Sequence, residues 1–282
     1  MSTFLQQLQG EAVKLFARKR TYIGFGAFLL LELVLFFVFQ LQGPERFFEK
    51  MINRQGGAFD HYFSGITLAY IILRLSVFLL GGLYLTLVGG DIVAKESEDG
   101  HLRLLLARPV SRLRLLTIKY LTCTGYAFVL IQFIAWSALI LGIAMKGWGG
   151  GFFAFAPEQG VAALYEWGEG LQRYLLAAFF LGLAMTTISS VAFFFSCFPI
   201  KPAAATITAL SYALIDMILR ESNFLDDYKH LLITTYISSW ARLVGDPIEW
   251  ALVVRNFTVI GAVNLSLFIV GVAVFSSRDL KS

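Results

Sequence analysis

Residues 22–42 read YIGFGAFLLLELVLFFVFQLQ, an apolar run in which Glu32 is the one charged residue. About 20 mostly apolar residues are enough for an α-helix to cross the hydrocarbon core of a bilayer. Five further stretches of this kind follow, at residues 66–90, 113–145, 171–197, 203–219 and 253–275. The pattern predicts an all-α, polytopic membrane protein whose six transmembrane helices form one domain over residues 1–282.

The composition of the chain agrees with a membrane protein. Of the 282 residues, 57% are apolar and only 15% are charged, whereas soluble domains average about 45–50% and about 25%. These values exclude a disordered chain, a fibrous repeat and an ordinary cytosolic enzyme. The two cysteines, Cys123 and Cys197, lie in apolar surroundings and form neither a disulfide framework nor a metal-binding pattern.

The segments between the spans carry the signals for orientation. Lys and Arg near the span ends number 13 on the N-terminal side and 9 on the other side. Because positive charge marks the cytoplasmic side, we expect a multi-pass protein of the cell (plasma) membrane with both termini cytoplasmic. Residues 1–21 are expected to form an amphipathic leader helix on the membrane surface. Residues 220–252 are expected to form an extracytoplasmic interfacial segment.

The cytoplasmic segment between spans two and three, residues 91–112, reads DIVAKESEDGHLRLLLARPVSR. We expect Ser97 to cap a new helix, with Glu98 and Asp99 in its first turn. Glycine is costly inside a helix, so Gly100 is taken to mark the close approach of another backbone. Pro109 then suits the first position of the next helix. The residues alone leave two interpretations open: an element that transmits force to two spans, or a solvated loop that sets topology.

Residues 96–112 follow the pattern E-x-E-x-G-x-L-x-L-L-x-x-R-P-V-S-R, with Lys119 seven residues later. This run resembles the permeases of type-2 ABC exporters, the ABC-2 superfamily. The leader helix, the six spans, the polar insertion before span six and the FSSRDL tail at residues 275–280 are similar to that family as well. The resemblance covers essentially the whole chain, but only the 91–112 segment is specific.

The resemblance implies how the protein works and with what it assembles. Such permeases pair with a second permease subunit, as a homodimer or a heterodimer, and each docks a separate ABC-type ATPase through a cytoplasmic coupling helix. The residues that match this coupling segment are Glu96, Glu98, Asp99, Gly100, Leu102, Arg103, Leu105, Arg108, Pro109 and Arg112. In the family, spans one, two and five meet at the dimer axis.

The chain itself contains no G-x-x-x-x-G-K-[ST] motif, so no phosphate-binding loop is predicted in it. We therefore expect a non-catalytic subunit without a cofactor or a metal of its own, with ATP and Mg bound by the partner ATPase. Membrane lipid is the other expected partner, and no nucleic acid is expected. The apolar interior suits an apolar or amphipathic cargo such as a drug, a lipid or a peptide.

Three charged residues are read as lying well inside the predicted spans, away from their ends: Glu32, Arg74 and Asp216. Such residues are functional candidates by default. Glu32 and Arg74 are interpreted as a pair that fixes the packing of spans one and two, and a polar lining or a proton relay is left open. The alternative function is a free-standing secondary transporter or channel that uses this pair, although no inverted repeat supports it.

Two further interpretations concern a membrane enzyme and the aromatic residues. A membrane-embedded enzyme is disfavoured because His61 and His230 are expected on the side opposite to Glu98. The phenylalanines of residues 152–155 and 193–195 are expected to face lipid or the membrane interface, where aromatic residues gather.

Overall fold

The computed structural model describes residues 3–100 and 111–278. Within these residues, six helical units are long and apolar enough to span a membrane, which confirms the all-α polytopic fold. They are α2 (Lys19–Val38), the continuous α5 (Gly65–Ser76), η1 (Val77–Gly81) and α6 (Gly82–Glu98), then α8 (Arg112–Lys146), α9 (Trp167–Ser196), α10 (Pro202–Glu221) and α12 (Trp250–Ser277). The break between α9 and α10 contains Pro199, which cannot continue a helix, and Pro202 takes the first position of α10, where proline is tolerated.

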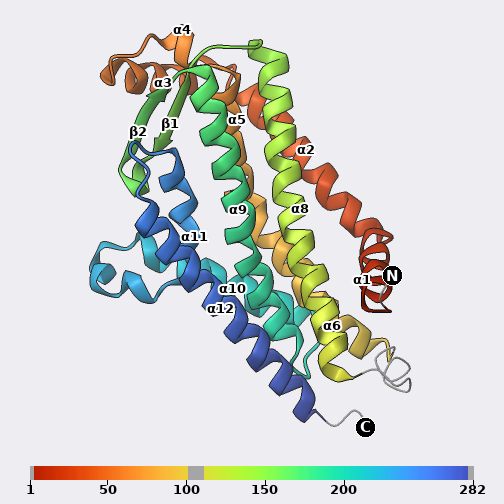
Figure 1. The fold of residues 1–282 in the computed structure, drawn as a ribbon. Coiled ribbons are helices and arrows are strands. Elements are labelled where there is room, and N and C mark those ends of the chain that lie inside the picture. Colours follow the sequence, from red (N-terminus) through yellow and green to blue (C-terminus); the bar gives the residue numbers. More distant parts are fainter. Residues whose placement is uncertain (1–2, 101–110, 279–282) are drawn as a thin grey trace.

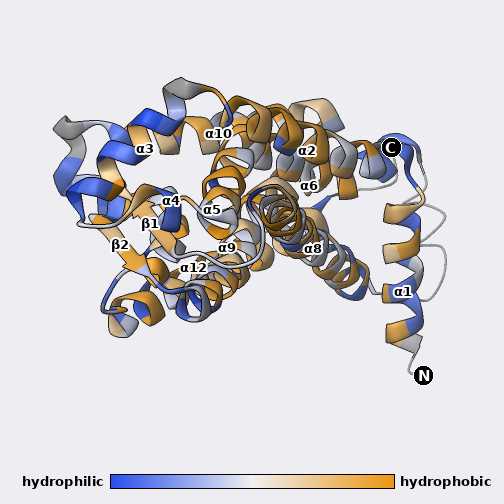
Figure 2. Cartoon of the chain, turned by 90° about the horizontal axis from the view of Figure 1, so that it is seen from above, coloured by the Kyte–Doolittle hydropathy of each residue, from blue (hydrophilic) through white to orange (hydrophobic). Residues whose placement is uncertain are grey.

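The long helices run between two ends of the molecule that carry different elements (Figure 1). One end, here called the terminal end, holds the leader helix α1 (Thr3–Phe16) and the described end of α12. The other, here called the hairpin end, holds α3 (Gln42–Arg54), α4 (Phe59–Tyr62) and the strands β1 (Phe152–Ala156) and β2 (Val161–Tyr165). Seen from above, the bundle is mainly hydrophobic, whereas polar residues gather on α3 and on one face of α1 (Figure 2).

Helix α9 occupies the centre of the bundle and contacts α6, α8, α10 and α12. In its most apolar window 67% of the residues are buried, against 22% in α10 and 11% in α12. The outward faces of α10 and α12 are therefore exposed apolar surfaces. Helices α5 and α8 approach closely where Gly65 faces Gly142, because a Cβ atom on either glycine would overlap the backbone of the other.

The phenylalanines at 152–155 form a strand, so the prediction that they face lipid is wrong. Strands β1 and β2 pair in antiparallel register from Phe152 opposite Tyr165 to Ala156 opposite Val161. Phe152 and Phe153 are fully buried, because the segment η4 (Ser238–Val244) and α5 cover the hairpin. Burial raises the pKa of Tyr165 to about 12, so its phenol stays protonated and donates to the Val244 carbonyl at 2.9 Å.

Phe193 is likewise buried, at 0% exposed, rather than facing lipid as the sequence suggested. Its ring lies on the bundle side of α9 and stacks with Phe268 of α12 at a centroid distance of 6.3 Å. Aromatic composition alone did not distinguish a face against lipid from a face against another helix, since both are apolar.

Helix length places the hairpin end outside the bilayer. Helix α10 has 20 residues, or about 30 Å, which matches the thickness of the hydrocarbon core. Helix α8 starts at the same end of the bundle and has 35 residues, or about 52 Å. If α10 just crosses the membrane, the last 15 of the 35 residues of α8 and the hairpin beside them project into water.

Candidate functional site

A cluster of four charged side chains, two of them buried, joins three helices at the terminal end. The Lys119 ammonium of α8 lies 2.7 Å from a carboxylate oxygen of Glu11 on α1 and 2.7 Å from one of Glu96 on α6. Lys14 of α1 forms an ion pair with the other oxygen of Glu96. The Lys119 side chain is 0% exposed and that of Glu96 is 2% exposed. Two cations thus face two carboxylates, so the burial of the Lys119 and Glu96 charges is compensated.

The leader residues of this cluster were missed as site residues from the sequence. Glu11 and Lys14 lie three positions apart and therefore on one face of α1. The signal that could have identified them is Lys119, an ammonium group seven residues inside an otherwise apolar span. A lysine in that position requires a carboxylate nearby, and Glu11 and Glu96 are the two that reach it.

Helix α6 extends beyond the predicted span at 66–90 and past the residue predicted to cap a new helix. It continues through Ser97 to Glu98, so the prediction that Ser97 caps a new helix is wrong. The last turn of α6 is bound by residues from other segments: Arg278 donates to the Ser97 hydroxyl at 3.1 Å, and Lys119 forms an ion pair with Glu96. Asp99 is the C-terminal cap, and its N–H bonds to the Lys95 carbonyl at 2.9 Å.

The reason why a glycine occupies position 100 differs from the one inferred from the sequence. No atom lies within 4 Å of the position that its Cβ would take, so no other described backbone approaches it. Its φ angle is +72°, in the left-handed region that glycine adopts without steric cost. Gly100 therefore ends α6 in the usual way for a glycine just past the last helical residue.

Arg112 and Arg278 fasten the starts and ends of three helices to one another. The Ser111 hydroxyl caps α8 by accepting from the Arg114 N–H at 3.2 Å. Arg112 then donates to the carbonyls of Ser276 at 2.8 Å and Arg278 at 3.1 Å, which joins α8 to the end of α12. Arg278 donates to the Cys197 carbonyl at 3.1 Å, after the end of α9.

The structure therefore describes part of the predicted coupling segment. Glu98 and Asp99 are exposed at the end of α6, whereas Glu96 and Arg112 hold helices together. Five predicted residues lie outside the described residues: Leu102, Arg103, Leu105, Arg108 and Pro109. The described residues on either side of them, Gly100 and Ser111, both belong to the terminal end that the ion cluster and the two arginines fasten.

The predicted pair of Glu32 and Arg74 does not form. Arg74 donates to the Phe155 carbonyl at 2.7 Å and forms an ion pair with Glu158, in the turn of the β-hairpin. Sequence reasoning counted Arg74 as intramembrane because the apolar run continues on both sides of it. The hairpin, a long-range structure, supplies the partner instead. Glu32 is fully buried on α2, and its carboxylate oxygens make no hydrogen bond with any described residue.

Asp216, a functional candidate from the sequence, holds the segment that follows α10. Its two carboxylate oxygens accept from the N–H groups of Ile233 at 3.1 Å and Thr234 at 2.7 Å. These donors open the short helix α11 (Ile233–Ile237), so Asp216 caps that helix from a distance of 17 residues. Among the described residues, no group of three or more His, Cys, Asp or Glu is placed to hold a metal ion.

Comparisons with known proteins identify relatives of the chain. The family described as ABC-2 family transporter protein matches residues 7–216. The chain is also 30% identical over 82 residues to the "Uncharacterized protein YhcI" of Bacillus subtilis (strain 168). That similarity covers 29% of this chain and 26% of YhcI, so the chain matches about a quarter of the length of this curated relative.

Proposed function

We proceed from the fact that this chain belongs to the ABC-2 family of transporter proteins, and we propose how it acts in such a transporter. It is the membrane-spanning permease subunit of an ABC transporter and works with an ATPase subunit. We propose that the terminal end docks this ATPase and that residues 96–112 carry the movement from ATPase to membrane. ATP and Mg are then bound by the partner, since this chain has no phosphate-binding loop motif.

The observation that carries the proposal is the fastening of four helices at one end. Lys119 joins α8 to α1 and α6, and Arg112 joins α8 to α12. A force applied between Gly100 and Ser111 is therefore transmitted to α1, α6, α8 and α12 together. A loop whose sole task is to set topology needs basic residues, but it does not need this network of buried contacts.

Exposed groups beside the segment supply the proposed contact with the ATPase. Glu98 and Asp99 are exposed and lie at the end of α6, next to the segment that matches the family pattern. Complementary charges at an interface orient the partners and suppress wrong pairings. We therefore propose that these carboxylates face basic side chains of the ATPase.

The apolar outward surfaces support a dimer in a lipid bilayer. Exposed apolar residues on α10 include Ile207 and Ile218, each 63% exposed. We propose that α2 and α10 contact a second permease subunit, identical or homologous, and that α12 faces lipid.

The proposal also includes the location and the cargo of the transporter. The membrane is the plasma membrane and both termini are cytoplasmic. The cargo is an apolar or amphipathic molecule that is exported.

The test is a charge reversal that spares the fold. Glu98→Lys is expected to lower recovery of the ATPase with the permease by at least about tenfold, because it opposes like charges at the interface. The matched control is Glu49→Lys, an exposed glutamate on α3 at the hairpin end. Membrane abundance is measured beside recovery of the complex. Normal abundance and normal recovery for Glu98→Lys would contradict the docking role.

A further inference from the structure

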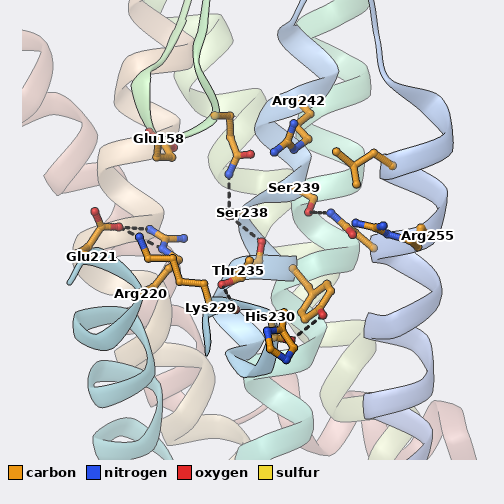
Figure 3. Close-up of a pocket in the computed structure, with 14 residues that line it drawn as sticks. Glu158, Arg220, Glu221, Lys229, His230, Thr235, Ser238, Ser239, Arg242 and Arg255 are labelled. Atoms are coloured by element: carbon orange, nitrogen blue, oxygen red, sulfur yellow. Dashed lines mark hydrogen bonds and ion pairs between the residues drawn. The ribbon is translucent and has the colours of Figure 1, made fainter. Parts of the chain in front are cut away.

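A cavity of about 500 Å³ with several charged side chains in its lining opens beside the hairpin (Figure 3). Its walls come from the hairpin turn, the end of α10, the segment from η3 (Asn223–Leu231) through α11 to η4, and the first turns of α12. Arg220 on α10 and Arg255 on α12 lie on opposite sides of the cavity. Nothing proposed above for the terminal end uses this cavity.

The lining carries an excess of positive charge. Arg220, Lys229, Arg242 and Arg255 face the cavity, against the two carboxylates Glu158 and Glu221. Glu158 is already engaged by Arg74, which is not part of the lining. With His230 neutral, the lining therefore has two more cations than anions.

Most of these cations have a carboxylate partner, but one does not. Glu221 pairs with Arg220 at 2.6 Å, Asp226 with Lys229 at 2.7 Å, and Glu249 with Arg242 at 2.9 Å. Arg255 is exposed and forms no hydrogen bond or ion pair with any described residue. Its guanidinium therefore keeps all five donors available for an anionic ligand.

The cavity lies at the level of the membrane boundary. Glu221 ends α10, about 30 Å from the start of that helix. Arg255 precedes the end of α12 at Ser277 by 22 residues, or about 33 Å. Tyr228 and Trp250 beside the cavity are 60% and 49% exposed, as expected for aromatic side chains in the headgroup region.

Apolar side chains continue from the cavity toward the middle of the membrane. On α10, Ile215 and Ile218 are 57% and 63% exposed, and on α12 Leu265, which follows Arg255 toward the terminal end, is 58% exposed. A molecule whose headgroup occupies the cavity therefore finds apolar surface for its chains on both walls. This combination of an unpaired cation at headgroup level and apolar flanks fits an amphiphile better than a fully soluble anion.

We propose that this cavity binds the anionic headgroup of an amphiphile that lies in the membrane, with Arg255 as its principal ligand. A guanidinium binds phosphate oxygens through two parallel hydrogen bonds, and Arg242 approaches from the neighbouring wall. This inference specifies the headgroup chemistry of the amphipathic cargo proposed above. It rests on the proposed function only where the bound amphiphile is taken to be transported. Binding itself requires no ATPase.

The test measures binding to the purified full-length permease in a neutral detergent, without ATPase. The probes are short-chain phosphatidylglycerol and phosphatidylcholine with the same chains. The unchanged protein is expected to bind the anionic lipid about tenfold more tightly, and Arg255→Gln is expected to abolish this preference. The matched control is Arg54→Gln, an exposed arginine at the end of α3 outside the cavity, which keeps the preference.

Three results would overturn the proposal. Equal affinity of the unchanged protein for the two lipids would contradict a site for an anionic headgroup. An unchanged preference for phosphatidylglycerol in Arg255→Gln would contradict the role of Arg255 as its ligand. Inorganic phosphate that binds as tightly as phosphatidylglycerol would show a site for soluble anions. Thermal melting is expected to be the same for Arg255→Gln and the unchanged protein, since Arg255 has no described partner to lose. None of these results bears on whether Glu98 docks an ATPase.

Discussion

At the scale of single residues, the terminal end depends on charges that are buried but matched. Lys119 contacts two carboxylates, and Glu96 contacts two ammonium groups. Isolated charges in such surroundings would be neutralised or excluded, because transfer of an ion out of water costs several kcal/mol even after relaxation. The cluster therefore persists only while α1, α6 and α8 remain together, which makes it a specific joint between these helices.

Removal of the central cation is expected to destabilise the protein strongly. Lys119→Met leaves Glu96 buried with one cation instead of two, and the loss of a buried partner costs about 3 kcal/mol. The measurement is thermal unfolding of the detergent-purified protein. The control is Lys95→Met, an exposed lysine on α6 with no described ion pair, which should melt as the unchanged protein does. Equal melting of the two variants would contradict a stabilising role for the cluster.

Gly100 is expected to tolerate asparagine better than alanine. At a φ of +72°, alanine loses about 1 kcal/mol relative to glycine, whereas asparagine adopts this conformation more easily. Hydrogen exchange of the last turn of α6 measures the effect, which should be faster in Gly100→Ala than in Gly100→Asn. Gly10 lies in the middle of α1 with open space around it, so Gly10→Ala should slow hydrogen exchange in α1, because alanine favours a helix. Equal exchange in the two Gly100 variants would disprove the conformational explanation.

At the scale of helices, small residues decide which pairs approach closely. Gly65 on α5 and Gly142 on α8 lie backbone to backbone, a contact that glycines permit in membranes. Gly142→Ala is therefore expected to separate the two helices and to cost about 2 kcal/mol. Gly125→Ala, on the same helix but with nothing within 4 Å, serves as the control and should not lower stability. Thermal melts in detergent compare the two, and a Gly142→Ala protein as stable as the Gly125→Ala protein would contradict the close contact between α5 and α8.

Helix length also distributes the polar residues between membrane and water. Because α8 is 15 residues longer than α10, one side of the bundle extends beyond the other at the hairpin end. Arg74 uses this extension to bind Glu158 in the hairpin turn rather than a carboxylate inside the bilayer. The cavity that contains Arg255 lies on the shorter side, at the level where α10 ends.

At the scale of the whole molecule, the two ends should lie on opposite sides of the membrane. The native cysteines, Cys123 and Cys197, are both 0% exposed and should not react. A membrane-impermeant maleimide on intact cells is expected to label Gln55→Cys at the hairpin end and not Gln9→Cys on α1, both exposed positions. Permeabilised cells should label both. The reverse pattern on intact cells would invert the orientation and place the docking end outside.

The sequence by itself determined the elements that depend on local composition. Six apolar runs predicted six spanning helices, because backbone groups in lipid must bond within their own segment. The spacing around Glu96 and Gly100 indicated the family, which the match over residues 7–216 established. The predicted spans at 171–197 and 203–219 likewise correspond to α9 and α10, which Pro199 keeps separate.

Only the tertiary structure decided which residues meet. Lys119 contacts Glu11 across 108 positions, and Arg74 contacts Glu158 across 84 positions. The sequence paired Arg74 with Glu32 because both lie in apolar runs, and it took the phenylalanines at 152–155 for a lipid face. Burial by lipid and burial by protein select the same apolar residues. Partners, faces and the depth of each charge are therefore fixed by packing between distant segments, which local composition does not encode.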